Sequence, residues 1–194
     1  MSMDIESSLS KPAASADDQL KKARMGAEAV RTVIETFKEE GIDLIVTLPE
    51  EPTFSLTDAI RKDPYFTAAT VTDENTGICL SAGAALGGRS TVFVTGVAGL
   101  LVSTWALAQM GMVFGAPFII MASYRGDFGD RTGIPGSQLA MFKRVAEPLL
   151  QTLNVPYQIV DQETKLKKAI VGAHFACRSY SSPVALMLAG EVLW

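Results

Sequence analysis

The stretch FTAATVTDENTGICLSAGAALGGRSTVFVT (66–95) has two short apolar runs on either side of a longer segment of small residues. The runs 66–72 and 90–95 are rich in β-branched side chains, which favour strands. The segment between them predicts a helix that begins near Thr72 or Asp73, because such residues commonly cap helix N-termini. A strand, a helix and a strand in succession predict two parallel strands joined by a crossover helix.

The same alternation extends along the rest of the chain. Further strands are expected at 42–48, 117–123, 156–161 and 183–189, and further helices from Ser15 or Asp17 to Glu40 and at 53–62, 98–112, 137–152 and 163–180. The strands are continuous apolar runs, as in parallel sheets that are buried on both faces. The pattern predicts an α/β fold over 17–194, a doubly wound six-stranded parallel sheet in three αβα layers, after a disordered tail at 1–16.

The composition excludes several classes of protein. Of the 194 residues, 48% are hydrophobic and 20% charged, and the net charge is −4, which argues against a nucleic-acid surface. No apolar run approaches the roughly 20 residues that a membrane helix needs. The N-terminal segment lacks the apolar core of a secretory signal, so Cys79 and Cys177 are expected to be reduced thiols of a cytoplasmic protein. The sequence contains one histidine and two cysteines that are far apart in the chain, which is too few ligands for a metal site, so none is expected.

Ligands of doubly wound sheets bind at the carboxyl ends of the strands. The segments there are LPEEP (48–52), TDEN (72–75), TGVAG (95–99) and SYRGDFGD (123–130). TGVAG could cradle a phosphate or could simply form a tight turn. In the last segment and just beyond it, Arg125 and Arg131 could bind an anionic substrate, and Asp127 or Asp130 could orient the two arginines. A solvated charged loop explains the same residues equally well.

His174 lies on a predicted helix that is remote from all of these strand ends. A surface or packing role is therefore expected for it, and a Ser–His–acid hydrolase is not expected.

Glu74 stands at the start of the helix that follows the second strand. Helix capping and the helix dipole are enough to explain an acid at this position. They do not explain the small residues from Gly77 to Ala85, which leave one face of the helix nearly bare and let a ligand or another backbone approach. A carboxyl group that is desolvated in this way has a raised pKa and can share a proton with a ligand nitrogen.

Four segments, in this order, resemble the pyrimidine-binding domain of thiamine-diphosphate enzymes: TDENTGICLSAGAALGG, TGVAGLL, PFIIMASYRGDFGD and LLQTLNVPYQIVD. The similarity covers about 25–190 and is strongest to the α subunit of sulfopyruvate decarboxylase and to phosphonopyruvate decarboxylase. It implies that Glu74 hydrogen-bonds the aminopyrimidine ring of the cofactor and favours its imino tautomer. It also implies cofactor contacts from Thr95, Gly96, Gly99 and Leu100, and substrate contacts from Pro49, Glu50, Arg125 and Asp127.

The resemblance further implies that part of the site lies on another chain. Related enzymes bind the diphosphate and its Mg2+ through a Gly-Asp-Gly motif, which this sequence lacks. We therefore expect a partner β subunit that carries this motif, in an α2β2 or larger assembly. Glu50 and Glu51 stand where relatives have small polar residues, and they would repel a doubly anionic substrate. This departure indicates a substrate other than sulfopyruvate itself.

The sequence thus predicts the α subunit of a two-subunit thiamine-diphosphate-dependent 2-oxo acid decarboxylase. Three alternatives stay open at this point. The chain could be a catalytically degenerate subunit that scaffolds or regulates its partner, or a subunit of a thiamine-diphosphate-dependent carboligase or lyase. It could also be a flavodoxin-like domain that binds a nucleotide or a flavin.

Overall fold

The computed structural model describes residues 24–126 and 136–193, and the expected tail at 1–16 lies outside them. Its centre is a six-stranded sheet with the order β2-β1-β3-β4-β6-β5, in which every neighbouring pair is parallel. The strands are β1 (Leu44–Thr47), β2 (Thr67–Thr70), β3 (Thr91–Gly96), β4 (Ile119–Ser123), β5 (Tyr157–Val160) and β6 (Val184–Leu188). The predicted fold class is confirmed.

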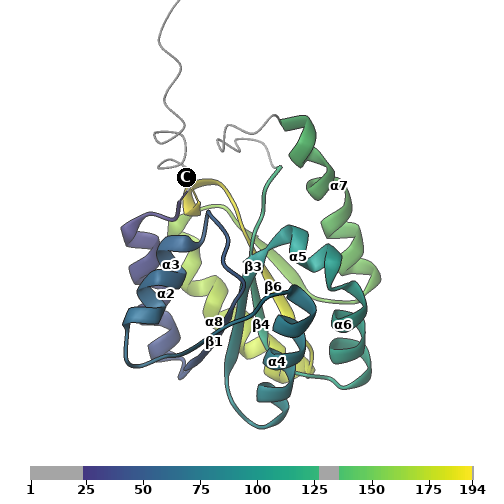
Figure 1. Ribbon diagram of the computed structural model, residues 1–194, viewed down its shortest axis with the longest axis horizontal. Coiled ribbons are helices and arrows are strands. Elements are labelled where there is room, and N and C mark those ends of the chain that lie inside the picture. The colour runs from purple at the N-terminus through teal and green to yellow at the C-terminus, as the bar shows by residue number, and fades with distance from the viewer. Residues whose placement is uncertain (1–23, 127–135, 194) are drawn as a thin grey trace, which may run out of the picture.

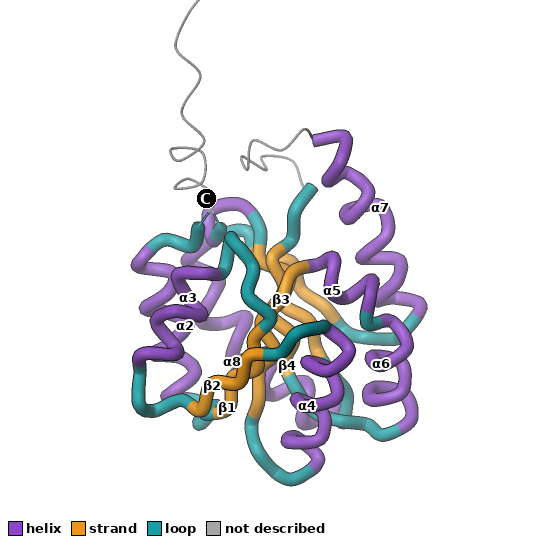
Figure 2. Tube along the Cα trace, viewed as in Figure 1, coloured by secondary structure: helices purple, strands orange, loops and turns teal. Residues whose placement is uncertain are grey.

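Helices cover both faces of this sheet and complete three layers (Figures 1 and 2). One face carries α2 (Ala27–Glu39), α3 (Phe54–Lys62) and α8 (Glu163–Tyr180). The other carries α4 (Glu74–Leu86), α5 (Val97–Val102), α6 (Thr104–Ala108), the π-helical turn η1 (Gln109–Val113) and α7 (Gly136–Thr152). A short 3-10 turn, η2 (Gly190–Val192), follows the last strand. The hydrophobic core is accordingly divided into two clusters, one on each face of the sheet.

The apolar runs of the sequence become the central strands. Every residue of β1, β3, β4 and β6 is buried, because helices cover these strands on both faces. The edge strand β2 has the weaker sequence TAAT and is mostly exposed. Burial therefore follows the position of each strand in the sheet.

The first described helix begins later than the sequence predicts. The predicted start at Ser15 or Asp17 lies outside the described residues, but the helix is not continuous with α2, because residues 24–26 are not helical and Gly26 occupies the N-cap of α2 in an extended conformation. Its predicted end is confirmed: Gly41 adopts a φ of +68°, which glycine tolerates without strain, and its amide donates to the Lys38 carbonyl.

The single helix predicted at 98–112 is wrong, because the segment is divided into α5, α6 and η1 with a break at Ser103. The Ser103 hydroxyl donates to the Gly99 carbonyl at 2.6 Å, and the Thr104 hydroxyl donates to the Leu101 carbonyl at 2.7 Å. Such side-chain bonds compete with the regular helical pattern and commonly bend helices.

Two further predictions concern membrane-spanning helices and the state of the cysteines. Within the described ranges, every helix is too short or too polar to cross a bilayer. Cys79 is exposed on α4, Cys177 is buried in α8, and both are free thiols. Burial raises the pKa of the Cys177 thiol to about 11, so this group stays protonated at neutral pH.

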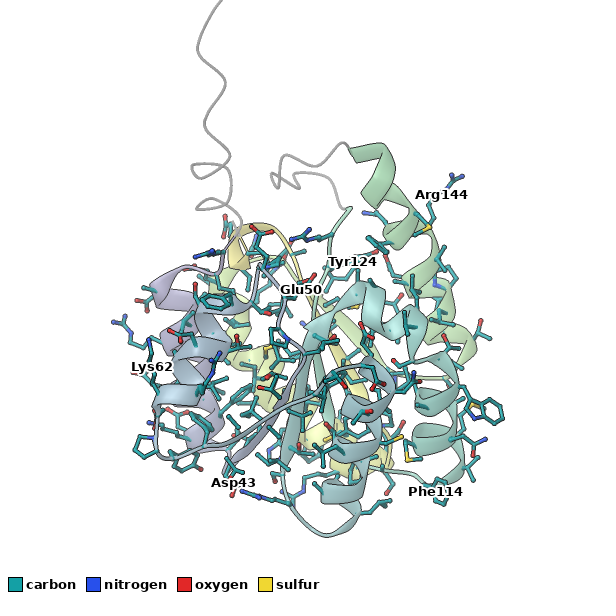
Figure 3. All side chains as sticks on the ribbon, viewed as in Figure 1. Asp43, Glu50, Lys62, Phe114, Tyr124 and Arg144 are labelled. Atoms are coloured by element: carbon teal, nitrogen blue, oxygen red, sulfur yellow. The ribbon has the colours of Figure 1, made fainter. Side chains whose placement is uncertain are left out.

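The order of the strands creates a switch point between β1 and β3. From β1 the chain passes through α3 to the edge strand β2, and it returns through α4 to β3 on the other side of β1. Loops at such a point diverge and leave a crevice at the carboxyl ends of the strands. Figure 3 shows Asp43, which precedes β1, and Glu50, which follows it, at opposite ends of the sheet, with Tyr124 near the same end as Glu50.

The small residues of α4 do not form the open face that the sequence suggested. Gly77, Ser81, Ala82 and Ala85 are buried against the chain's own core, and a Cβ at Gly77 would overlap the ring of Phe93 in β3. The expectation of a bare face open to a ligand is therefore wrong. These residues are small because α4 packs closely on the sheet.

Two glycines of α4 provide a matched test of this packing. Gly77→Ala is expected to lower the free energy of unfolding by about 1–3 kcal/mol, because its methyl group would displace the buried Phe93 ring. At Gly83 a Cβ would meet no atom within 4 Å, so Gly83→Ala is expected to raise stability by up to about 1 kcal/mol through helix propensity. Urea denaturation measures both changes, and equal effects would contradict the close contact.

Candidate functional site

A small cavity of about 130 Å3 lies at the carboxyl ends of β1 and β3. It is lined by Leu48, Pro49, Glu50, Glu74, Thr95, Gly96, Ala98 and Gly99. Three of the four segments expected at the strand ends therefore meet here. Complete small-molecule sites have volumes of about 300–1,000 Å3, so this cavity has room for only part of a larger ligand.

Glu74 enters this cavity from the first position of α4. The helix is capped by its neighbour Asp73, whose carboxylate accepts the Thr76 amide at 2.9 Å and the Thr76 hydroxyl at 2.6 Å. Asp73, one of the two predicted cap residues, is thus the observed N-cap, and the Glu74 side chain does not cap the helix. Its half-buried carboxyl group has no hydrogen-bond or ion-pair partner in the described ranges.

Two glycines of the TGVAG segment make room for the carboxyl groups. A Cβ at Gly96 would lie 2.5 Å from Glu50 Oε1, and one at Gly99 would lie 2.5 Å from Glu74 Cγ and 2.8 Å from Thr95 Oγ1. Both glutamates therefore lie directly against the backbone between β3 and α5. Of the two roles that the sequence left open for this segment, the structure favours the tight turn.

Glu50 is held in place by residues from β4 and the loop after it. The Ser123 hydroxyl donates to Glu50 Oε2, and Arg125 Nε lies 3.9 Å from Glu50 Oε1. Burial raises the pKa of the Glu50 carboxyl group; the Ser123 hydrogen bond and the Arg125 charge oppose this effect, while the charges of Glu51 and Glu74 add to it. Arg125 Nη2 also lies 3.6 Å from Glu51 Oε2, so the guanidinium is shared by two acids.

The remaining predicted residues lie in different places. Thr95 and Pro49 line the cavity, whereas Leu100 is fully buried in the core and does not line it. Asp127, Asp130 and Arg131 lie outside the described residues.

Ser123 was missed by the sequence analysis. The only signal was a polar residue that closes the otherwise apolar strand IIMAS. Its contact with Glu50 depends on the pairing of β3 with β4, which brings Ser123 beside Gly96.

A second polar cluster lies at the opposite ends of the strands. His174 Nδ1 is 2.9 Å from Glu40 Oε2, and its Nε2 is 3.3 Å from the Ser90 hydroxyl, beside an open hollow of about 670 Å3. A Ser–His–acid hydrolase would also need two free backbone amides that stabilise an oxyanion. The amides of Gly88 and Arg89, which precede Ser90, instead donate to carbonyl groups within their own turn. The cluster ties α2, α8 and β3 together, which agrees with a packing role for this histidine.

No group of three or more His, Cys, Asp or Glu side chains that could hold a metal ion occurs in the described ranges.

Comparison with solved structures defines the class of fold. The chain matches a thiamine diphosphate-dependent 4-hydroxybenzoylformate decarboxylase from Rhodococcus jostii RHA1 with a TM-score of 0.66 and 14% identity. The match covers 85% of this chain but only 30% of that one. The chain therefore has the fold of one domain of a thiamine-diphosphate enzyme and spans less than a third of that structure's length.

Two curated relatives are similar over nearly their whole length. The sulfopyruvate decarboxylase subunit alpha of Methanococcus maripaludis is 27% identical over 160 residues, 82% of this chain and 93% of that protein. The protein of the same name from Methanothermobacter thermautotrophicus is 24% identical over 146 residues, 75% of this chain and 86% of that protein. No family model matches the sequence. The resemblance first indicated by the motifs is confirmed by these relatives.

The buried carboxyl group of Glu50 predicts a pH-dependent effect on stability. Because its pKa is raised in the folded state, its ionisation favours unfolding, and wild-type stability falls as the pH rises from the unfolded pKa through the folded one. We expect Glu50→Gln, which can still accept from Ser123, to raise the melting temperature at pH 8 and to leave it nearly unchanged at pH 4. Thermal unfolding followed by circular dichroism measures the difference, and a gain that is equal at both pH values would contradict this account.

Proposed function

We propose that this chain is the pyrimidine-binding α subunit of a two-subunit thiamine-diphosphate-dependent 2-oxo acid decarboxylase. The observation that carries the proposal is the unpartnered carboxyl group of Glu74, which faces a cavity at the switch point of the sheet. The named α subunits that the chain resembles support the reaction class. A carboxylic acid without a protein partner at such a position is well suited to exchange a proton with a ligand nitrogen.

The residues present fit one end of the cofactor. Glu74 and Thr95 would hold the aminopyrimidine through a carboxyl and a hydroxyl group, while Gly96 and Gly99 line the cavity and make room for the two glutamate side chains. When bound, thiamine diphosphate would supply the nucleophilic carbon and the electron sink that decarboxylation of a 2-oxo acid requires.

The chain's own contribution is a positioned carboxyl group and a cavity with partly apolar walls. The Asp73 cap fixes the start of α4, and Gly99 lets Glu74 lie against the β3–α5 turn, so the carboxyl group has a defined location. Leu48, Pro49 and Ala98 supply apolar walls that limit the access of water. Electrostatic interactions are stronger in such a partly buried site than in bulk water.

Glu74→Gln tests the catalytic role, because the amide keeps the shape but cannot take up or release a proton. We expect turnover of the assembled enzyme to fall at least about 100-fold. Asp73→Asn is the matched control: it changes the adjacent acid, keeps the helix cap, and is expected to retain most of the activity. Steady-state decarboxylation assays compare the two variants. Unchanged turnover in Glu74→Gln would favour a scaffold or regulatory subunit.

We assign the other half of the site to a β subunit. The cavity has room for only part of the cofactor, and the sequence lacks the Gly-Asp-Gly motif that holds the diphosphate and Mg2+ in the enzymes it resembles. The relatives are named as alpha subunits, which supports a second kind of chain. An α2β2 or larger assembly would place each cofactor between an α and a β subunit.

The described surface offers an apolar face for this β subunit, which extends from the helix that carries Glu74 to the opposite end of the sheet, where Figure 3 places Phe114. Large hydrophobic side chains are exposed on α4, on the α5–α6 segment that follows Gly99, and at η1, where Figure 3 labels Phe114; they are Leu80, Leu86, Val102, Trp105, Met112, Val113 and Phe114. Exposed apolar groups in such numbers mark interaction surfaces. Because α4 also carries Glu74, a chain that covers this face reaches the cavity.

Two exposed aromatic residues on opposite faces of the molecule test this assignment. Trp105 on α6 is 74% exposed, and Phe175 on α8 is 73% exposed. Trp105→Lys is expected to weaken binding of the β subunit at least about tenfold, because aromatic residues contribute strongly to interfaces, whereas Phe175→Lys leaves binding unchanged. Sedimentation or calorimetric titration with the purified β subunit measures both constants. Equal weakening, or weakening by Phe175→Lys alone, would place the interface elsewhere.

A further inference from the structure

We propose that Glu50 and Glu51, which follow β1 beside the cavity, exclude a second anionic group, so that the site takes 2-oxo acids whose reacting carboxylate is their only anionic group. This inference rests on the proposed function and specifies its substrate class.

The described charges at the cavity are predominantly negative. Glu50 and Glu74 line it, and Glu51 is joined to it through Arg125. Three carboxylates and one guanidinium carry a net charge of −2 when all are ionised, and the net charge is still −1 when Glu50 is protonated. The net charge of these groups therefore stays negative as long as no more than one of the three carboxylates is protonated.

Arg125 can serve one carboxylate but not two anionic groups. Its side chain is only 13% exposed and is shared between the carboxylates of Glu50 and Glu51 at 3.9 and 3.6 Å. Both distances exceed normal hydrogen-bond lengths, and the buried Nε has no hydrogen-bond acceptor among the described residues. The guanidinium does not line the cavity, and it carries a single positive charge. Its positive charge is already offset by the two glutamates.

Glu50 cannot easily turn away from the cavity. Its carboxyl group receives the Ser123 hydroxyl on one side and lies against the Gly96 backbone on the other, where even a Cβ would meet it at 2.5 Å. A second anionic group on a substrate would therefore meet a fixed carboxyl group. Repulsion between like charges at such short range in a partly buried site lowers kcat/KM by about tenfold or more.

The test compares two substrates of nearly the same shape with the assembled enzyme, isolated through an affinity tag on this chain. Sulfopyruvate carries a sulfonate, and 3-(methylsulfonyl)pyruvate replaces its charged oxygen by a methyl group. We expect the uncharged analogue to have the larger kcat/KM by about tenfold or more. A preference for sulfopyruvate would overturn the inference and leave the proposed function standing. Absence of decarboxylation with both compounds and with simple 2-oxo acids would overturn the proposed function as well.

Three variants then identify the residues responsible. Glu50→Gln and Glu51→Gln are each expected to shift the ratio of the two kcat/KM values about tenfold toward the sulfonate. Glu39→Gln removes the same formal charge from the surface of α2, where Glu39 pairs with Lys167, and is expected to leave the ratio unchanged. Because the readout is a ratio, loss of total activity alone does not imitate the effect. If one of the two site variants fails to fold, the other variant still tests the inference. An unchanged ratio in the site variants, or an equal shift in Glu39→Gln, would overturn it.

Discussion

The close approach of α4 and two glutamates to β3 is the constraint on which the rest of the site depends. A Cβ at Gly77 would overlap Phe93, and Cβ atoms at Gly96 and Gly99 would meet the side chains of Glu50 and Glu74. Because these three glycines have no side chain, α4 and the two carboxyl groups occupy space that a side chain would otherwise fill. Since the protein interior is packed to nearly crystalline density, a methyl group at any of these positions has to displace a neighbour.

This packing gives the two glutamates different environments within one cavity. Glu74 is held by the backbone of a capped helix and has no side-chain partner in the described ranges. Glu50 is likewise half-buried, but it is engaged by Ser123 and Arg125, and burial raises the pKa of its carboxyl group. Pairs of titratable groups in contrasting surroundings often divide the work of a site. Here the contrast supports proton exchange at Glu74 and charge selection at Glu50.

The structure places Glu74 at the cavity, but not for the reason that the sequence suggested. Glu74 was singled out because a bare helix face appeared to follow it, yet that face packs on the sheet. Helical spacing shows which residues share a face, but it does not show what covers that face. The role of Ser123 was not foreseen, because it depends on the pairing of β3 with β4. The break at Ser103 was missed because local side-chain bonds overrode helix propensity.

By itself, the sequence determined the layer architecture, the parallel sheet and the strand ends at which the cavity lies. It could do so because continuous apolar strands alternating with helices admit few other folds. Only the tertiary structure decided the order of the strands, and with it the meeting of Glu50, Glu74 and Gly96 at the switch point between β1 and β3. The environment of each carboxyl group also came from the fold, because burial and partners are set by segments far apart in the chain.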